Sequence, residues 1–398
     1  MSDPILIIGA GISGLVLAQY LQSKGVLYQI FERDSAQDTR NGGWGLTLTW
    51  ALPALCELLP ESVVQQFPEC FVNKDAAIRG DVGRFHFFDL KSGESIYNIP
   101  AAQRIRVNRG RLRQVLTAGI NIQWNKNFVS MESSDDSITA QFEDGTSYTG
   151  RLLVASDGAR SRARQILYPS YQMNSLPVQL LGASPLYSVE DMKGAQSIDP
   201  FIFMGTHPDT NIFLFFGFLD TPANFEESSK DKYHCQVIVS WDDTQNIAVP
   251  DGDSERIALM KKLTADWAEP FRSLVHNLPD DIAARSIRIE DWMFHPNRTH
   301  VHQRTVLMGD SAHTMTMYRG EGANNSIIDV QDLVKIVDMT NPESFKLETL
   351  AASLEAYERT IFTRVRPSLL GSRQACLDAH NFAKIMEGSP LIEERLLQ

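Results

Sequence analysis

The feature that most constrains the fold is a glycine-rich turn near the N-terminus, Gly9–Gly14, with the pattern G-x-G-x-x-G. It follows an apolar run, Pro4–Ile8, that is typical of a short buried strand, and it precedes a helical pattern over Ile12–Ser23. A second strand is expected to end at Gln29–Glu32. The first glycine of such a turn permits its sharp bend, the second lets the backbone approach a pyrophosphate, and the third allows close helix–strand packing. The pattern therefore predicts an α/β unit that binds a dinucleotide at the N-terminus of a helix.

The acidic residue Glu32 supports this interpretation. It closes the second strand, where a carboxylate can accept hydrogen bonds from both ribose hydroxyls, and Arg33 beside it is assigned to the same site. A glycine turn also occurs without any ligand, but here the strand, the helix and the acidic residue are all in place. The motif alone does not choose between NAD and FAD.

Two further motifs follow in the chain. Leu152–Arg164 is a buried-strand pattern that runs into the motif D-G-x-x-S-x-x-R, which begins at Asp157. Val306–Asn324 contains a second strand pattern, the pair Gly309-Asp310 and later a glycine-rich stretch before a helical pattern over Ala323–Val337. Each motif alone is compatible with an ordinary turn. All three together, in this order, are hard to explain in that way.

With these motifs the chain resembles the single-component FAD-dependent aromatic hydroxylases of the para-hydroxybenzoate hydroxylase fold, especially FAD monooxygenases of natural-product pathways. The resemblance extends from Gly9 to about Arg366. It implies an α/β fold: a Rossmann-like FAD-binding domain, an inserted mixed β-sheet substrate domain and C-terminal helices. It also implies noncovalent FAD, transient NAD(P)H as electron donor, and insertion of one oxygen atom from O2 through a flavin hydroperoxide.

Changes in composition along the chain suggest the domain boundaries. Residues 170–295 are richer in aromatic residues and alternate as strands do. One helix is expected over Leu259–Val275, and the helical periodicity of the C-terminal part is expected to be interrupted at Pro367. The expected domains are 1–170 with 296–345 for FAD (71–100 being a candidate part of the substrate region), 171–295 for the substrate-binding sheet, and 346–398 for a C-terminal helical segment.

The resemblance also assigns individual residues to the cofactor. Arg109 opens an R-x-x-L helix whose arginine contacts FAD in the family, with Arg113 as a helper, and Asp310 is matched to the aspartate that binds the ribityl hydroxyls. The family chemistry is carried by the flavin, so no catalytic side chain is assigned, and no metal site is expected. The expected cofactor-binding residues are Gly9, Gly11, Gly14, Glu32, Arg33, Gly43, Gly45, Arg109, Arg113, Asp157, Asp310, Gly322, Ala323 and Asn324.

The substrate site is expected on the sheet of the second domain. Phe203, Phe213 and Phe215 alternate along two strand patterns, and Met317 lies in the loop before the last helix. For any one phenylalanine, packing in the core is the commoner role. By analogy with the family, the substrate is an apolar, aromatic or polycyclic small molecule of secondary-metabolite type.

One loop departs from the family pattern and keeps other functions open. Relatives carry one or two prolines where residues 314–319 have none, and a glutamine where this chain has Glu321, which adds a negative charge near the flavin. A reductase or oxidase of the same fold, without oxygen insertion, is therefore the alternative. A flavin-binding protein with a regulatory or scaffold role is the third possibility. Hydroxylation, epoxidation and Baeyer–Villiger insertion all stay open.

Charge and composition exclude several other classes. The 37 Lys and Arg residues stand against 49 Asp and Glu residues, a formal charge of −12, so a sequence-independent nucleic-acid binder is not expected. The four cysteines form no C-x-x-C pair, and no apolar run reaches the roughly 20 residues of a membrane helix. We expect a cytoplasmic enzyme, monomeric or weakly dimeric, with a small apolar molecule and O2 as its partners.

Overall fold

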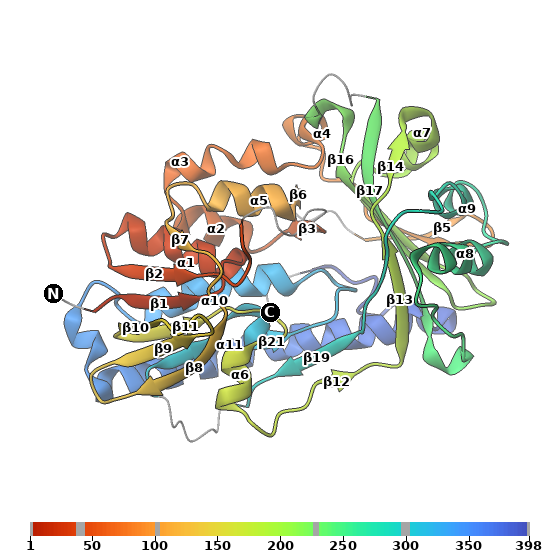
Figure 1. The fold of residues 1–398 in the computed structure, drawn as a ribbon. Helices are drawn as coiled ribbons and strands as arrows, with labels where there is room; N and C mark the ends of the chain where they lie inside the picture. The colour runs from red at the N-terminus through yellow and green to blue at the C-terminus, as the bar shows by residue number, and fades with distance from the viewer. Residues whose placement is uncertain (1–2, 37–43, 100–103, 226–230, 296–302, 396–398) are drawn as a thin grey trace.

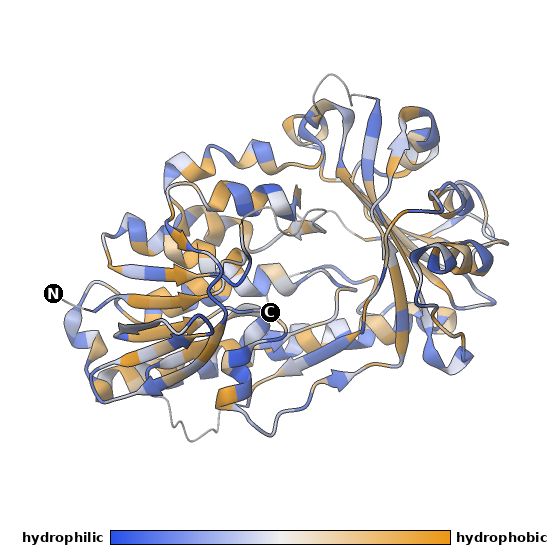
Figure 2. Ribbon diagram, in the orientation of Figure 1, coloured by the Kyte–Doolittle hydropathy of each residue, from blue (hydrophilic) through white to orange (hydrophobic). Residues whose placement is uncertain are grey.

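The structure is a computed structural model that describes residues 3–36, 44–99, 104–225, 231–295 and 303–395. Two sheets dominate it, one in the dinucleotide half of the molecule and one standing edge-on at the other end (Figure 1). Figure 2 shows apolar residues concentrated in the strands and hydrophilic residues spread over the surrounding helices. Among the described residues, no helix is both long and apolar enough to span a bilayer.

The first sheet has five parallel strands in the order β20-β11-β1-β2-β7. Every residue of β1, β11 and β20 is buried, which explains why these strands appear in the sequence as continuous apolar runs. Their bounds are β1 Ile5–Ile8, β2 Tyr28–Phe31, β7 Ile122–Gln123, β11 Leu152–Ala155 and β20 Thr305–Leu307. Because the three buried strands are parallel neighbours, the three motifs that follow them meet at one edge of the sheet.

The glycine turn after β1 packs directly against the motif after β11. Gly9 has a φ of +102°, and a Cβ there would lie 2.4 Å from the carbonyl oxygen of Ser156. A Cβ on Gly14 would lie 2.1 Å from the carbonyl oxygen of Gly9. The Ser156 hydroxyl donates to the carbonyl oxygens of Ile8 and Gly9, both at 3.0 Å. Glycine is therefore required here for the close contact of helix α1 (Ile12–Ser23) with two strands.

The second sheet has eight strands and is mixed. Strands β15 and β4 pair in parallel, and the other neighbouring strands of the sheet pair antiparallel. Helices α7 (Val189–Ile198), α8 (Asp253–Leu263) and α9 (Phe271–His276) cover its outer face (Figure 1). The strands are β4 His86–Asp89, β5 Ser95–Asn98, β13 Val178–Ala183, β14 Leu186–Ser188, β15 Ile202–Thr206, β16 Phe213–Asp220, β17 Lys232–Asp242 and β18 Ala284–Ser286. The Rossmann-like unit, the mixed sheet and the C-terminal helix confirm the predicted fold class.

Shorter elements connect and flank the two sheets. Strands β3 (Gly45–Leu48) and β6 (Ile105–Asn108) form a separate antiparallel pair that leads into helix α5 (Arg109–Leu116). The remaining strands are β8 Phe128–Ser133, β9 Ile138–Phe142, β10 Ser147–Gly150, β12 Asn174–Ser175, β19 Glu290–Met293 and β21 His313–Thr314. The remaining helices are α2 Leu52–Leu58, α3 Glu61–Val64, α4 Lys74–Ile78, α6 Arg162–Leu167, α10 Gly322–Ile336 and α11 Leu347–Ala379, with short 3-10 turns between some of them.

Two expectations about helices are wrong. Leu259–Val275 is not one helix: α8 ends at Leu263 and α9 begins after Pro270. Pro270 disfavours helical geometry at Glu269, so a continuous helix through this segment is not possible without distortion. Conversely, α11 continues for 33 residues through Pro367. Pro367 lies on the exposed face, where water can bind the carbonyl group that loses its partner, while Val365 and Leu369 stay buried on either side of it.

The close contact at Gly14 gives a testable prediction. Gly14→Ala should lower the free energy of unfolding of the FAD-free protein by about 1–3 kcal/mol, since overpacking a tight contact costs that much. Gly11→Ala is the matched control, because Gly11 has a φ of −79° and a Cβ there would meet no atom within 4 Å. Urea unfolding of both variants checks the difference. Equal losses of stability in the two variants would contradict the close-packing argument.

Candidate active site

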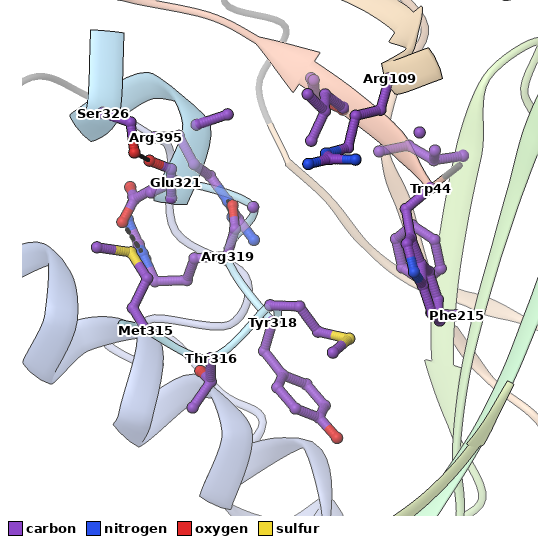
Figure 3. A pocket seen from close by; sticks show the side chains of 18 of the residues that line it. Trp44, Arg109, Phe215, Met315, Thr316, Tyr318, Arg319, Glu321, Ser326 and Arg395 are labelled. Carbon is purple, nitrogen blue, oxygen red and sulfur yellow. Dashed lines mark hydrogen bonds and ion pairs between the residues drawn. The ribbon is translucent and has the colours of Figure 1, made fainter. Parts of the chain in front are cut away.

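A cavity of about 630 Å³ lies between the parallel sheet and the eight-stranded sheet. Its size is in the range of cofactor and substrate sites. One side is formed by residues of the three motifs, and the other by side chains of β15, β16 and β17. Figure 3 shows the start of α10 and the loop before it on one side, with Arg109, Trp44 and Phe215 opposite.

Part of the motif side of the cavity is open main chain. Gly11, Gly158 and Ala159 line it, and a Cβ on either glycine would meet no atom within 4 Å. This open space beside Gly11 is where the sequence predicts a pyrophosphate. The N-terminus of α1 directs its unpaired N–H groups to the same place. The backbone here therefore fits a phosphate-bearing cofactor.

The side chains of Glu32 and Arg113 brace the glycine turn instead of lining the cavity. Glu32 accepts hydrogen bonds from the N–H groups of Ala10 at 2.8 Å and Asp34 at 3.1 Å. Arg113 donates to the carbonyl oxygen of Ala10 at 2.8 Å, and its Nη2 lies 3.8 Å from Glu32. Arg33 is exposed, and Gly43 lies outside the described residues. The structure thus gives Glu32 and Arg113 a shared structural contact that the sequence did not suggest.

Arg109 and Asp310 both line the cavity. Arg109 opens α5, whose first turn is capped by the Asn108 side chain, which accepts from the N–H groups of Gly110 and Arg111. The Asp310 side chain is accessible from the cavity but enclosed by protein on its other sides. This burial raises the pKa of Asp310, and the charges of His313, Arg109 and Arg164 act in the opposite direction. An aspartate in this position can accept hydrogen bonds from ligand hydroxyls.

The Asp157 carboxylate helps to cap helix α6. It accepts from the N–H groups of Arg162 at 2.7 Å and Ala163 at 3.2 Å, and so holds the turn that presents Gly158. Burial raises the pKa of Asp157, while these hydrogen bonds lower it. The carboxylate is not among the groups that line the cavity, so the D-G motif contributes its backbone there.

Arg164 links the second motif to the third. It is fully buried, and its guanidinium lies over the rings of Tyr171 and Trp292 at 4.9 and 4.8 Å. It donates to the carbonyl oxygens of Ala159 and Asp310. Nothing in the sequence distinguishes Arg164 from a solvated surface arginine. Arg164 lies three residues after Ser161, which caps α6, and this position does not reveal a role that depends on two aromatic rings from elsewhere in the chain.

A buried ion pair network fixes the loop that carries Asp310. The Asp329 carboxylate accepts from the Gly309 N–H at 2.8 Å and lies 2.6 Å from both His313 Nε2 and Arg364 Nη2. Burial alone would raise the pKa of Asp329, but His313 and Arg364 hold it below its usual value. His313 is thus part of a structural network and does not line the cavity.

The N-terminus of α10 also reaches the cavity, through Gly322 and Ala323. Asn324 does not line it: its amide donates to Thr47 O at 2.9 Å and accepts from the Thr49 N–H at 2.9 Å, which ties α10 to β3. Gly45 at the start of β3 lines the cavity.

Glu321 forms a buried, two-pronged ion pair with Arg319, with distances of 3.0 and 3.1 Å. The negative charge expected from Glu321 is therefore balanced within the loop.

The loop also exchanges hydrogen bonds with α11, since Thr316 Oγ1 donates to Ser372 O and Ser372 Oγ donates to Thr316 O, both at 2.7 Å. Hydrogen bonds therefore restrain this loop, although it contains no proline.

Phe213 and Phe215 line the cavity from the sheet and Met317 lines it from the loop before α10, but Phe203 does not line it. Phe203 stacks on Phe216 with 4.8 Å between ring centroids, in the core on the other face of the sheet. Side chains alternate along a strand, so the neighbours of Phe203 on β15, Ile202 and Met204, line the cavity in its place. The expectation that Phe203 faces the substrate is therefore wrong.

Several further residues that the sequence did not suggest also line the cavity. These are chiefly Trp44, Phe85, Arg104, Arg106, Ile238 and Arg395. A signal existed for two of them: Arg104 and Arg106 are two positions apart just before Arg109, a spacing that places strand side chains on one face. Arg395 comes from the C-terminal tail, and no pattern in the sequence connects it with this site.

The Asp310 carboxyl, which faces the cavity, gives a prediction with two readouts. Asp310→Asn should raise the melting temperature of the FAD-free protein at neutral pH, because a carboxyl with a raised pKa destabilises the folded state once pH exceeds that pKa. The gain should shrink as the pH is lowered and wild-type Asp310 becomes protonated. The same substitution should weaken FAD binding about fivefold to tenfold, since the amide oxygen still accepts a hydrogen bond and only the charge assistance, about 1–1.5 kcal/mol, is lost. Differential scanning fluorimetry and FAD titration check both. An unchanged melting temperature with unchanged FAD affinity would show that Asp310 has neither role.

Comparisons with known proteins agree with this geometry. The FAD binding domain family matches residues 88–341, and the NAD(P)-binding Rossmann-like domain family matches residues 7–49. A probable FAD-dependent monooxygenase of Arthroderma benhamiae is 39% identical, with 98% of this chain and 95% of that protein aligned. A FAD-dependent monooxygenase of Emericella nidulans is 38% identical over 85% of this chain and 88% of that protein.

Solved structures support the fold. The Klebsiella pneumoniae protein HpxO, solved in complex with FAD and uric acid, superposes with a TM-score of 0.73 over 95% of this chain and 89% of that chain, at 20% identity. The family match covers more than half of the chain, and the Arthroderma relative aligns over nearly its whole length. The chain therefore belongs to the family of FAD-dependent monooxygenases with a para-hydroxybenzoate hydroxylase-like fold, and its cofactor is FAD.

Proposed function

We propose that this monooxygenase takes electrons from NAD(P)H and inserts one atom of O2 into an apolar, aromatic or polycyclic small molecule of secondary-metabolite type. The observation that carries the proposal is a single cavity, lined on one side by the dinucleotide motifs and on the other by an apolar sheet face. A cofactor and a substrate placed there would be in direct contact.

The residues present fit FAD. Gly11 leaves open space for a pyrophosphate, Arg109 supplies a cation, and Asp310 supplies an acceptor for ribityl hydroxyls. The start of α10 at Gly322 would lie toward the flavin ring, where a helix N-terminus stabilises negative charge by about 0.3–1 kcal/mol when exposed. When bound, FAD supplies the electron transfer and the activation of oxygen.

The protein contributes a dry chamber for the substrate. Ile202, Met204, Phe213, Phe215 and Ile238 form an apolar wall on the sheet side of the cavity. Excluding water from a flavin site prevents the side reaction that releases peroxide. This wall supports an apolar, flat substrate.

NAD(P)H is proposed to bind only transiently. The chain has one G-x-G-x-x-G motif, and the match to the NAD(P)-binding family, residues 7–49, includes the turn that we assign to FAD. A second dinucleotide would therefore lack a dedicated Rossmann unit. Tight, stoichiometric binding of NADPH in the absence of substrate is not expected.

The alternative is a reductase or oxidase of the same fold that does not insert oxygen. Its support in the sequence is the loop at residues 314–319, which lacks the proline that stiffens the loop beside the flavin in relatives. The hydrogen bonds between Thr316 and Ser372, and between Tyr318 and Ser240 at 3.0 Å, restrain this loop from two sides. This bracing supports the monooxygenase proposal.

Oxygen-18 labelling tests the proposal. Turnover of an aromatic substrate with NADPH under 18O2 gas should place one labelled oxygen atom in the product, which mass spectrometry detects. Hydrogen peroxide should account for a minority of the NADPH consumed, because the apolar wall and the braced loop keep water from the flavin. A product without label from the gas would move the assignment to the reductase or oxidase.

A further inference from the structure

One polar side chain, that of Gln236 on β17, interrupts the apolar wall that the eight-stranded sheet presents to the cavity. The other side chains from strands of this sheet that line the cavity are all apolar: Leu180, Ile202, Met204, Phe213, Phe215 and Ile238. Side chains alternate along β17, so Gln236 shares the cavity face with Ile238, whereas Cys235 and Val237 pack in the core on the other face. The register of the strand therefore directs this amide into the chamber.

The neighbours of Gln236 determine which end of its amide faces the chamber. The amide oxygen accepts from the Gly45 N–H at 3.4 Å. On the adjacent strand Gln236 pairs with Gly217, which has no side chain to cover the amide. The guanidinium of Arg106 lies against both glycines, since a Cβ on either one would clash with its Nη2. The Gly45 N–H and the guanidinium are both donors, so they select the amide oxygen on their side and leave the amide nitrogen for the chamber.

The protein gives this amide nitrogen no acceptor. Within the described ranges, the contact with Gly45 is the one hydrogen bond of the Gln236 side chain. Gln236 is 4% exposed, so little water reaches the amide, and a bound cofactor and substrate would exclude more. A buried N–H group without a partner destabilises the folded state, whereas an apolar side chain at this place would not. The free N–H groups therefore indicate an acceptor that a ligand supplies.

We infer that Gln236 orients the substrate by donating a hydrogen bond to a neutral oxygen acceptor on it, such as a ketone or quinone carbonyl. The amide is uncharged, so a neutral oxygen satisfies its N–H group without burying another charge. The rings of Phe213 and Phe215 on the same wall suit the aromatic part of such a molecule. In apolar pockets a few placed polar groups fix the orientation of the ligand. The inference rests on the proposed function, because it assigns a chemical feature of that substrate.

The carbonyl groups of the flavin ring are the other oxygen acceptors that could meet this amide. The position of Gln236 favours the substrate, because the groups proposed for FAD at Gly11 and Asp310 follow strands of the parallel sheet, whereas Gln236 belongs to the apolar wall. The affinity for FAD in variants of Gln236 separates the two ligands.

Two isosteric probes test the inference: 2-acetonaphthone, a neutral aromatic ketone, and 2-isopropenylnaphthalene, in which a CH2 group replaces the carbonyl oxygen. Both are titrated into the FAD-loaded protein, and the change in the flavin absorption spectrum reports binding. Gln236→Leu should lower the affinity for the ketone about threefold to tenfold, the effect of one neutral hydrogen bond, and should not lower the affinity for the alkene.

Two further variants serve as controls. Gln236→Glu keeps an acceptor for the Gly45 N–H and removes the donor, so it should lose affinity for the ketone in the same way. Gln179→Leu removes an amide from the neighbouring strand β13, where Gln179 is bonded to Asp243 and does not line the cavity. It should leave the affinity for both probes unchanged. The affinity for FAD should be unchanged in all three variants.

Several results would overturn the inference: an unchanged affinity for the ketone in both variants of Gln236, equal losses for the ketone and the alkene, or no binding of the ketone by the wild-type protein up to its solubility limit. A loss of FAD affinity in Gln236→Leu, with ketone binding unchanged, would assign the amide to the flavin instead. If Gln236→Leu misfolds, Gln236→Glu decides, because it retains the partner of Gly45.

Failure of the proposed function would look different. A protein that binds FAD and is reduced by NADPH, yet loses no ketone affinity in either variant, refutes only the role of Gln236. A product without label from 18O2 refutes oxygen insertion and leaves the contact with Gln236 standing.

Discussion

The parallel pairing of β1, β11 and β20 is the constraint on which the site depends. Ile8 pairs with Ala155, and Ala155 pairs with Leu307, so the three strands end in one row. The residues that follow them come from widely separated parts of the chain, yet they form one edge of one cavity. Tight contacts then hold this edge together: Gly9 and Gly14 against Ser156, and Arg164 between the loops at Ala159 and Asp310.

The strands and motifs of this edge could be predicted from the sequence for a physical reason. A buried parallel strand needs a continuous apolar run, and a glycine turn that meets a phosphate leaves a local pattern. Helix α1 begins and ends at the expected residues, Ile12 and Ser23. Such local requirements involve few neighbours, so one sequence is enough to reveal them.

Other features depend on contacts between residues that are far apart in the chain, and a single sequence does not reveal such contacts. Phe203 and Phe213 look equivalent in the sequence, but the strand register places one in the core and the other in the cavity. Pro367 would interrupt an isolated helix, yet packing on both sides carries α11 through it. The buried position of Arg395 depends on a tail that folds back over Arg319 and Phe85.

The distribution of charge in the cavity also indicates what kind of ligand the cavity binds. The protein carries a net charge of −12, yet its cavity is lined by five arginines, one of which is paired with Glu321. Cations concentrated in the interior of an acidic protein indicate anionic ligands there. The phosphates of FAD would account for Arg109, which lines the motif side of the cavity.

The central claim is that this cavity holds noncovalent FAD against an apolar substrate wall. The visible spectrum of the purified protein tests it most directly, together with the FAD released when the protein is denatured. The account predicts a yellow protein that releases about one FAD per chain into solution. A colourless protein that also takes up no added FAD would contradict the account.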